Sequence, residues 1–265
     1  MSEAPVVLSQ IWIYPIKSLG GVRVRRAAIT AAGSLALDRE WVIVDAENQM
    51  VWQGDLPRMA LTRCALDADA ITVTCPGLAP LRIERNHPGE PRSLTMYKHD
   101  FAGIDAGDAA ARWLSAALGA NVRLVRIGLS AHRWPGLNPV HALSTGSLAA
   151  LNAALVANGG EPVEMERFRP NLVLAAAALP AYFEEQYAVI RFGDTELRRR
   201  EPCVRCELPN ISRLDANRGK QPLKLIGRLS RDRPTAAPAS FGIYAMLSGA
   251  AAIAEGAGGV PVFRT

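Results

Sequence analysis

Cysteine, aromatic residues and long apolar runs are all scarce in this sequence of 265 residues. Four cysteines are too few for a disulfide-stabilised secreted scaffold, so we expect free thiols in a reducing compartment. The longest apolar run, residues 172–183, is interrupted by Pro180 and is far shorter than the roughly 20 residues that a membrane-spanning helix needs. The first residues contain Glu3 and no basic segment followed by an apolar one, which does not fit a secretory signal. The sequence therefore predicts a cytoplasmic protein that does not enter a membrane.

Charge of one sign is not in large excess either. The chain has 30 basic and 25 acidic residues, and this net charge of +5 does not by itself imply a nucleic-acid partner. The basic residues gather at 23–26, 198–200 and 220–233, without the interleaved aromatic side chains of a nucleic-acid-binding surface. We therefore expect no nucleic-acid partner. These clusters of basic residues are either solvated faces of strands and loops or a site for an anionic ligand.

Short strands separated by turns account for most of the predicted structure. Apolar or alternating segments bounded by turn residues indicate such strands. The predicted strands span residues 7–13, 22–24, 41–44, 50–52, 59–66, 71–75, 122–127, 171–175, 188–192 and 195–197, with a last one in the Ala- and Gly-rich tail. Many short strands at this spacing are typical of a barrel or a sandwich.

Two segments have helical periodicity instead. One follows residues 105–108 and ends at Gly119, and the other follows Ser144 and ends at residues 159–160. Because helices are few and strands are many, the predicted fold class is α+β and mostly β.

The pair Cys203 and Cys206 is the most distinctive chemical motif. It is expected in a loop rich in proline and arginine, where reactive groups are common. A structural zinc site needs four ligands, and the four histidines are scattered along the chain. A thioredoxin-type dithiol would begin a helix, whereas this pair follows a predicted hairpin. Two interpretations stay open. One is a single thiolate that binds a soft metal or acts as a nucleophile, with neighbouring arginines lowering its pKa, and the other is an ordinary pair of loop cysteines.

Two other short motifs are suited to binding an anion. Lys17 and Ser18 follow the first predicted strand and offer a cation and a hydroxyl group, as a phosphate requires. Arg169 and Asn171 flank Pro170 at the entry to another predicted strand. Each motif alone also fits an ordinary turn or strand entry.

In combination, these motifs resemble the MOSC family, which is related to the C-terminal part of molybdenum cofactor sulfurase and is preceded by an N-terminal β-barrel domain. The resemblance covers nearly the whole chain and implies a domain at residues 1–122, packed as a β-barrel-like unit on a MOSC β-barrel at residues 123–265 with a few helices. The segments that carry it occur in the family's order, at residues 14–18, 33–41, 57–58, 105–108, 113–114, 143–148, 151–152, 167–171, 203–206 and 241–242.

The resemblance implies that the chain binds molybdenum cofactor, in the form of Mo-molybdopterin. Cys206 corresponds to the cysteine that ligates molybdenum in the family's enzymes, and it is the predicted metal ligand and catalytic residue. A thiolate suits such a metal, and the cofactor's phosphate needs charged hydrogen-bond donors. The predicted contacts to the pterin and its phosphate are Lys17, Ser18, Arg39, Ser144, Thr145, Arg169, Asn171 and Arg205.

The implied function is that of the stand-alone bacterial relatives of the mitochondrial amidoxime-reducing component. These reduce small N-hydroxylated compounds, namely hydroxylamino-bases, hydroxamic acids and amidoximes. The alternative is a non-catalytic carrier of molybdenum cofactor or of a persulfide. One departure from the family lies at residues 207–219, where the loop after the predicted metal ligand is remodelled.

The electrons for such a reduction are expected from a separate protein, either a flavoprotein reductase or a ferredoxin. No glycine-rich nucleotide fingerprint follows a predicted strand. Four cysteines cannot ligate an iron–sulfur cluster while one of them also serves molybdenum, so no such cluster is expected. Pyridoxal phosphate is not expected either, because the desulfurase module that is often fused to MOSC domains is absent from this sequence.

Overall fold

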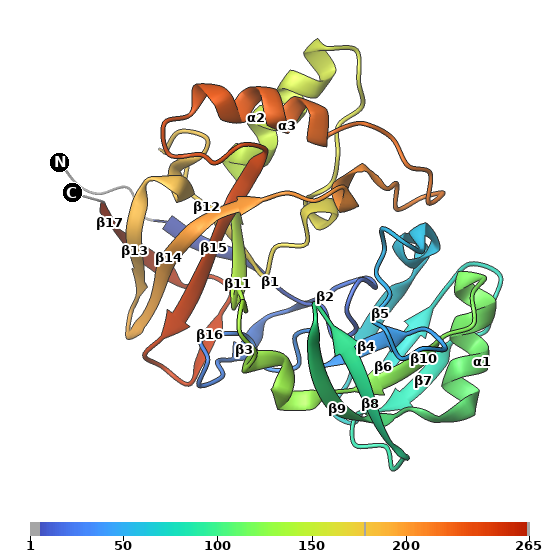
Figure 1. Cartoon of the computed structure of the whole chain (residues 1–265). Helices are drawn as coiled ribbons and strands as arrows, with labels where there is room; N and C mark the ends of the chain where they lie inside the picture. Colours follow the sequence, from blue (N-terminus) through green and yellow to red (C-terminus); the bar gives the residue numbers. More distant parts are fainter. Residues whose placement is uncertain (1–5, 178, 264–265) are drawn as a thin grey trace.

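The protein is built from two β-rich halves, which lie one above the other in Figure 1. The computed structural model describes residues 6–177 and 179–263. Within this part no helix is long and apolar enough to cross a membrane. The expected α+β, mostly β class is confirmed. The α-helices of the described part are α1 (Gly107–Leu118), α2 (Thr145–Ala157) and α3 (Leu223–Leu229).

The upper half is a closed barrel. Its eight-stranded sheet runs in the order β12-β11-β15-β14-β13-β17-β1-β2. The strands from β12 to β1 close into a ring because β12 also pairs with β1, and β2 continues the sheet beyond β1. Its strands are β1 (Val6–Ile13), β2 (Val22–Val24), β11 (Val140–Ser144), β12 (Leu172–Ala175), β13 (Tyr187–Phe192), β14 (Thr195–Val204), β15 (Ser240–Ser248) and β17 (Gly258–Phe263).

Strand alternation decides which side chains leave this barrel. Along β15, Ile243 and Ala245 belong to the barrel's buried core, whereas Tyr244 between them is only half-buried. On the neighbouring β11, Val140 and Ala142 belong to the same core, and His141 between them pairs across the strands with Tyr244. Because successive side chains of a strand point to opposite faces, His141 and Tyr244 point together out of the barrel.

The lower half contains a four-stranded sheet in the order β4-β10-β9-β8 and a three-stranded sheet in the order β5-β6-β7. A small additional sheet joins β3 to β16, and its buried residues Ala27 and Ile253 belong to the core of the barrel. Apolar clusters around Trp41 and around Val42 fill this half, because neighbouring residues of β4 are buried on both faces of the sheet. These strands are β3 (Arg26–Ala28), β4 (Trp41–Val44), β5 (Arg63–Leu66), β6 (Ala70–Thr74), β7 (Leu81–Glu84), β8 (Pro91–Met96), β9 (His99–Asp105), β10 (Arg123–Arg126) and β16 (Ala252–Ala254).

The chain starts in the barrel, continues into the lower half and returns at β11. Strand β1 therefore belongs to the barrel although it precedes the lower half, and β10 pairs with β4 and β9 although it follows residue 122. The division into domains at residues 1–122 and 123–265 stays a proposal. Strand β1, before residue 122, pairs with strands of the second range, and β10, after residue 122, pairs with strands of the first range.

Both long helices begin and end near the expected residues. Helix α1 ends where Gly119 adopts a left-handed conformation with φ 72°, which satisfies the C-terminal turn. Helix α2 begins at Ser144, whose hydroxyl accepts a hydrogen bond from the backbone N–H of Ser147. Helices α2 and α3 pack over one side of the barrel (Figure 1), around a buried cluster that includes Leu151 and Ile226.

Three local predictions were wrong. Residues 57–61 form a short 3-10 helix, so strand β5 begins only at Arg63, because Pro57 starts a helical turn. Met50 makes a single bridge to Val44 and residues 50–52 form no strand. Cys203 lies within β14 and not in a loop, because that strand stays paired with β15 as far as Val204.

Candidate functional site

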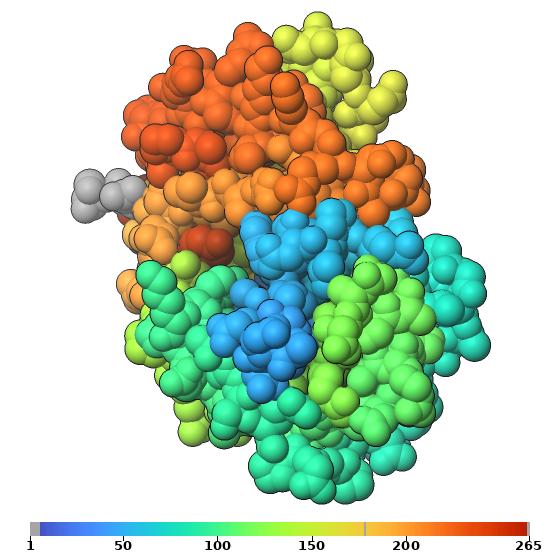
Figure 2. Space-filling view, turned by 45° about the vertical axis from the view of Figure 1, so that its right-hand side comes forward, coloured from blue at the N-terminus to red at the C-terminus, as the bar shows by residue number. Residues whose placement is uncertain are grey.

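A cavity of about 640 Å³, here called the main cavity, lies where the two halves meet. Figure 2 shows the recess between the upper half, in orange, and the blue segments of the lower half. Six residues predicted as site residues line it, contributed by segments far apart in the sequence. The lining residues are Lys17, Ser18, Arg39, Met50, Trp52, Asp55, Tyr97, His141, Phe168, Arg169, Arg205, Cys206, Leu208 and Tyr244.

The two cysteines of the motif have opposite environments. Cys206 follows the end of β14, is exposed and lines the main cavity. Cys203, inside β14, is completely buried. The side chain that can meet a ligand in the cavity is therefore that of Cys206.

The surroundings of Cys203 nevertheless favour its thiolate form. Arg205 Nη1 donates a hydrogen bond to Cys203 Sγ at 2.9 Å. Burial opposes ionisation, but the charges of Arg205 and His141 and hydrogen bonds from His141 and Tyr244 lower the pKa of Cys203 to about 6. The sequence predicted that neighbouring arginines lower the pKa of a cysteine in the motif, and Arg205 does so for Cys203. Arg200, by contrast, donates to the backbone oxygen of Leu137.

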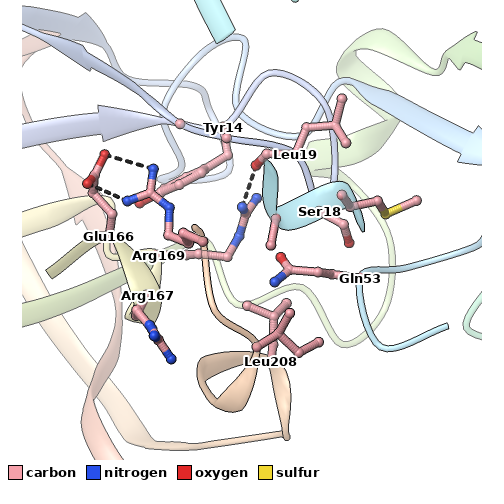
Figure 3. A pocket seen from close by; sticks show the side chains of 14 residues that line it. Tyr14, Ser18, Leu19, Gln53, Glu166, Arg167, Arg169 and Leu208 are labelled. Atoms are coloured by element: carbon pink, nitrogen blue, oxygen red, sulfur yellow. Dashed lines mark hydrogen bonds and ion pairs between the residues drawn. The ribbon is translucent and has the colours of Figure 1, made fainter. Parts of the chain in front are cut away.

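One wall of the main cavity is basic. The guanidinium groups of Arg39 and Arg169 lie 5.2 and 4.2 Å from the centre of the Tyr14 ring, and Lys17 Nζ lies 4.8 Å from the centre of the Tyr97 ring. Arg39 pairs with Asp38, whereas Arg169 donates to the backbone oxygen of Leu19 (Figure 3).

This wall carries more positive charge than its partners neutralise. Burial lowers the pKa of Arg169 to about 10, and the charge of Arg39 adds to the effect. Burial also lowers the pKa of Lys17, with further contributions from Arg39 and Arg169. Mutually repelling cations beside a cavity favour an anionic ligand, which would restore their charged forms.

The backbone of the wall is also strained. Ser18, Arg39 and Arg169 have φ values of 70°, 59° and 54°, in the left-handed region that non-glycine residues rarely occupy. Tyr97, across the cavity, has φ 52°. Such conformations cost on the order of 1 kcal/mol or more each and persist where the surrounding structure imposes them, which is frequently at binding sites.

Three predicted site residues do not line the main cavity. Ser144 is buried as the N-cap of α2, and its backbone N–H donates to Glu184 Oε1 at 3.2 Å. Thr145, the next residue, is exposed on that helix. Asn171 is buried, accepts from the backbone N–H of His141 at 3.1 Å and donates to the backbone oxygen of Trp12 at 3.2 Å. Its amide joins the strands behind the basic wall.

A small pocket behind the basic wall belongs to the packing between the two halves (Figure 3). Its volume of about 20 Å³ is enough for a water molecule and too small for a cofactor. Arg213, from the remodelled loop at residues 207–219, pairs here with Glu166, and its backbone oxygen accepts from Arg63 of the lower half. The loop therefore ties the two halves together beside the site.

Sequence reasoning missed eight of the fourteen lining residues, and three of these eight are Tyr97, His141 and Tyr244. No motif surrounds these three, and their positions follow from strand pairing and from the β8–β9 turn. In the described ranges, no group of three or more His, Cys, Asp or Glu side chains could hold a metal ion. Within this part of the chain, the thiol that lines the main cavity is that of Cys206.

Comparisons with known proteins show the family of the chain. The family model described as the MOSC N-terminal beta barrel domain matches residues 6–121, and that of the MOSC domain matches residues 130–258. Mitochondrial amidoxime reducing component 2 of Rattus norvegicus is 29% identical over 77% of this chain and 66% of its own length. Molybdenum cofactor sulfurase of Drosophila erecta is 26% identical over 89% of this chain and 31% of its own length.

The chain thus spans slightly less than two thirds of the amidoxime-reducing relative and about a third of the sulfurase. Among solved structures, the YUAD protein of Bacillus subtilis aligns over 99% of both chains with 12% identity and a TM-score of 0.44.

Proposed function

Because this chain belongs to the MOSC family, we propose that it binds molybdenum cofactor in the main cavity and reduces N-hydroxylated compounds there. The observation that carries the proposal is that a potential metal ligand and a basic wall lie in the same cavity. The exposed thiol of Cys206 and the under-neutralised wall of Lys17, Arg39 and Arg169 line the same cavity. A phosphate-bearing cofactor with a thiolate-accepting metal meets both requirements.

The residues fit the parts of this cofactor. Cys206 would ligate the metal, while Lys17, Ser18, Arg39 and Arg169 would hold the phosphate and the pterin. When bound, the cofactor supplies two-electron chemistry that accepts an oxygen atom from the substrate. Arg205, which lies between the two cysteines of the motif, also lines the cavity. It donates a hydrogen bond to Cys203 Sγ.

The proposed reaction converts R–NHOH, two electrons and two protons into R–NH2 and water. A separate donor, of the flavoprotein or ferredoxin class, supplies the electrons. Burial and the charge of Cys203 raise the pKa of Tyr244, so its hydroxyl group stays protonated and holds its proton firmly. Tyr244 lines the cavity beside His141, where it shapes the site as a neutral side chain.

The test compares variants of the two cysteines. Each variant is produced in a host that makes molybdenum cofactor, and its molybdenum content and benzamidoxime reduction are measured with a reconstituted NADH-linked donor. We expect Cys206→Ala to abolish molybdenum-dependent turnover and Cys203→Ala to reduce it less, since Cys203 is buried. Equal losses in both, or no loss in either, would contradict the assignment once circular dichroism shows intact folds.

The second candidate is a carrier of the cofactor or of a persulfide. The pKa of about 6 at Cys203 favours a nucleophilic sulfur, although this thiolate is buried. A carrier would retain full molybdenum loading and yet reduce no N-hydroxylated compound with any donor. Turnover with a reconstituted donor distinguishes the reductase from the carrier.

A further inference from the structure

The turn at residues 37–40, here called the Arg39 turn, has an unusual backbone. Leu37 and Arg39 have φ values of 67° and 59°, so two residues of this short turn occupy the left-handed region. Neither is a glycine, and such conformations persist where the surrounding structure imposes them. The turn leads directly into the buried Trp41 at the start of β4. The direction of the Arg39 side chain therefore depends on the contacts that hold this turn.

The carboxylate of Glu40 holds one side of the Arg39 turn. Glu40 Oε1 accepts a hydrogen bond from the backbone N–H of Leu37 at 2.8 Å, at the first left-handed residue. The backbone oxygen of Glu40 accepts from the N–H groups of Ile127 and Gly128 at 2.9 and 3.1 Å. Because Glu40 is buried and follows Arg39 directly, its side chain and its backbone both anchor the turn.

His132 connects this carboxylate to a second buried side chain. His132 Nε2 lies 3.3 Å from Glu40 Oε1, and His132 Nδ1 lies 2.8 Å from Ser34 Oγ. All three side chains are buried. His132 ends the 3-10 helix Gly128–His132, which leads from β10 in the lower half to β11 in the barrel. The imidazole therefore ties this connection to the segment that contains the Arg39 turn.

The surroundings of Glu40 favour its ionised form in spite of burial. Burial opposes ionisation, but hydrogen bonds from His132 and the Leu37 N–H, together with the charge of Arg126, lower the pKa of Glu40. Arg126 Nη2 lies 3.7 Å from Glu40 Oε2, so each carboxylate oxygen has a partner. An ionised carboxylate is a stronger acceptor than a neutral group, and it therefore holds the Leu37 N–H more firmly.

Contacts on the other side join the Arg39 turn to the barrel. The backbone N–H of Arg39 donates to the Tyr14 oxygen at 2.7 Å, and the Tyr14 N–H donates to Asp38 Oδ1 at 2.8 Å. The Arg39 guanidinium pairs with Asp38 and donates to Asn171 Oδ1 at 3.3 Å. The turn is thus held between the barrel on one side and the Glu40–His132 pair on the other.

We propose that Glu40 and His132 are positioning residues, which hold the Arg39 turn so that its guanidinium group faces an anion in the main cavity. Glu40 is not among the residues that line this cavity. His132 lines an adjoining cavity of about 320 Å³, but both of its ring nitrogens already have partners, so it acts through Glu40 and Ser34. The inference rests on the proposed function and deepens it, because it names buried residues that determine how tightly the phosphate is held.

The first experiment replaces His132 by two amides that each reproduce one ring nitrogen. His132→Gln keeps an N–H donor near the position of Nε2 for Glu40, whereas His132→Asn keeps a polar group near the position of Nδ1 for Ser34. Calorimetric titration measures the affinity of cofactor-free protein for inorganic phosphate. We expect His132→Asn to weaken phosphate binding about fivefold and His132→Gln to stay within about twofold of wild type. Equal losses in both variants, or none in either, would overturn the proposal.

The second experiment tests whether Glu40 acts through Arg39. Phosphate affinity is measured for Glu40→Ala, for Arg39→Ala and for the double variant. We expect Glu40→Ala to weaken binding about fivefold alone and to cause no further loss beside Arg39→Ala, since changes that act through one contact are not additive. Glu40→Gln, which keeps an oxygen acceptor for the Leu37 N–H, should restore most of the affinity. A loss of equal size in both backgrounds would show that Glu40 acts without Arg39, which overturns the proposal.

Glu185→Ala is the matched control, because it also removes a buried carboxylate from an ion pair, here with Arg233 at 3.1 Å. It should lower the melting temperature and leave the affinity for phosphate unchanged. A loss of affinity as large as that in Glu40→Ala would attribute both effects to general destabilisation and would overturn the positioning role.

Molybdenum and pterin content of the loaded protein separates this inference from the proposed function. Unchanged cofactor content and phosphate affinity in Glu40→Ala, with cofactor loss in Arg39→Ala, would overturn the positioning role and leave the proposed function intact. The expected pattern of phosphate affinities, in a protein that retains no molybdenum and reduces no N-hydroxylated compound, would support the positioning role and refute the proposed function.

Discussion

Cys203 and Cys206 are separated by two residues and yet differ in exposure and in chemistry. The difference arises because Cys203 lies within the paired strand β14, whereas Cys206 lies beyond its end. Arg205, between them, donates to the Cys203 sulfur and to the backbone oxygen of Phe168, each at 2.9 Å. The Cys203 sulfur and the Phe168 backbone together therefore hold this arginine beside the predicted metal ligand.

The first prediction concerns ionisation of Cys203. Thiolate absorbance at 240 nm in Cys206→Ala should show a titration with a midpoint at about 6, because Arg205 and His141 outweigh the burial of this thiol. Cys203→Ser should abolish that step. Burial raises the pKa of Cys64 to about 12, so Cys64 does not interfere. A first ionisation only above pH 8 would contradict the assignment.

Ionisation of Cys203 also makes the unfolding free energy depend on pH. The pKa of Cys203 is lower in the folded chain than in the unfolded chain, where it is about 8.5. Ionisation therefore stabilises the fold fully above that value, and the contribution is lost as the pH falls toward 6. The difference in unfolding free energy between wild type and Cys203→Ser should be largest at alkaline pH and should level off below pH 6.

The second prediction concerns Lys17. Its pKa is lowered by burial and by the charges of Arg39 and Arg169, so the ammonium group destabilises the protein when no anion is bound. Lys17→Met should therefore raise the melting temperature of cofactor-free protein. It should also weaken cofactor retention by about 1.5–3 kcal/mol, the range for hydrogen bonds to charged groups.

Lys98→Met, at an exposed lysine in the turn after β8, is the matched control for Lys17→Met. The readouts are calorimetric melting of cofactor-free protein and the molybdenum and pterin content of loaded protein. Unchanged cofactor content in Lys17→Met would place the phosphate elsewhere, with the arginines at residues 198–200 as the next candidates.

At the scale of elements, the third prediction concerns the start of α2. Ser144 caps this helix through the Ser147 N–H and also lies 2.8 Å from the Ser147 hydroxyl. Ser144→Ala should lower the unfolding free energy by about 1 kcal/mol, as loss of an N-cap does, and should leave the molybdenum content unchanged. Thr145→Ala, at the exposed neighbouring position, should change neither quantity.

Urea unfolding and elemental analysis measure these two effects. The resemblance to the family implied that Ser144 and Thr145 contact the cofactor. Loss of molybdenum from a well-folded Ser144→Ala variant would restore that role and show that the cofactor reaches beyond the main cavity.

At the scale of the whole molecule, the basic segment at residues 220–233 divides into two parts. Lys224 and Arg228 are exposed on α3, but Arg233 is not part of this surface. Arg233 pairs with the completely buried Glu185 at 3.1 Å. The surface available to an acidic electron donor is therefore narrower than the sequence indicated.

The fourth prediction concerns this surface. With an acidic donor, turnover should fall as salt rises, because the Debye length shortens to about 8 Å at 0.15 M ionic strength. Lys224→Glu combined with Arg228→Glu should lower kcat/KM for the donor several-fold at low salt and leave little salt dependence. The same reversal at Arg82 and Arg85, on the lower half, is the control.

A small chemical reductant separates donor docking from chemistry in this test. With dithionite-reduced viologen in place of the protein donor, the α3 variant should turn over at the wild-type rate. A salt dependence that survives the charge reversal on α3 would place the donor's contact on another face.

The elements were largely determined by local sequence. Helix α1 ends at Gly119 and α2 begins at Ser144 because a left-handed glycine and a hydroxyl N-cap act within one turn of the chain. Strand β10 forms where residues 122–127 alternate, and this pattern is also contained within a short stretch of the chain. The 3-10 turn at Pro57 was missed, since its apolar residues continue the strand pattern.

The site was determined only in part by the sequence. Motifs identified Lys17, Arg39, Arg169, Arg205 and Cys206, but their convergence on one cavity depends on contacts between residues more than a hundred positions apart. The burial of Cys203 is decided by the pairing of β14 with β15 on either side of it. The outward direction of His141 and Tyr244 is decided by their shared register on β11 and β15. Periodicity and capping are encoded within a few residues, whereas strand pairing and cavities exist only once distant segments have packed together.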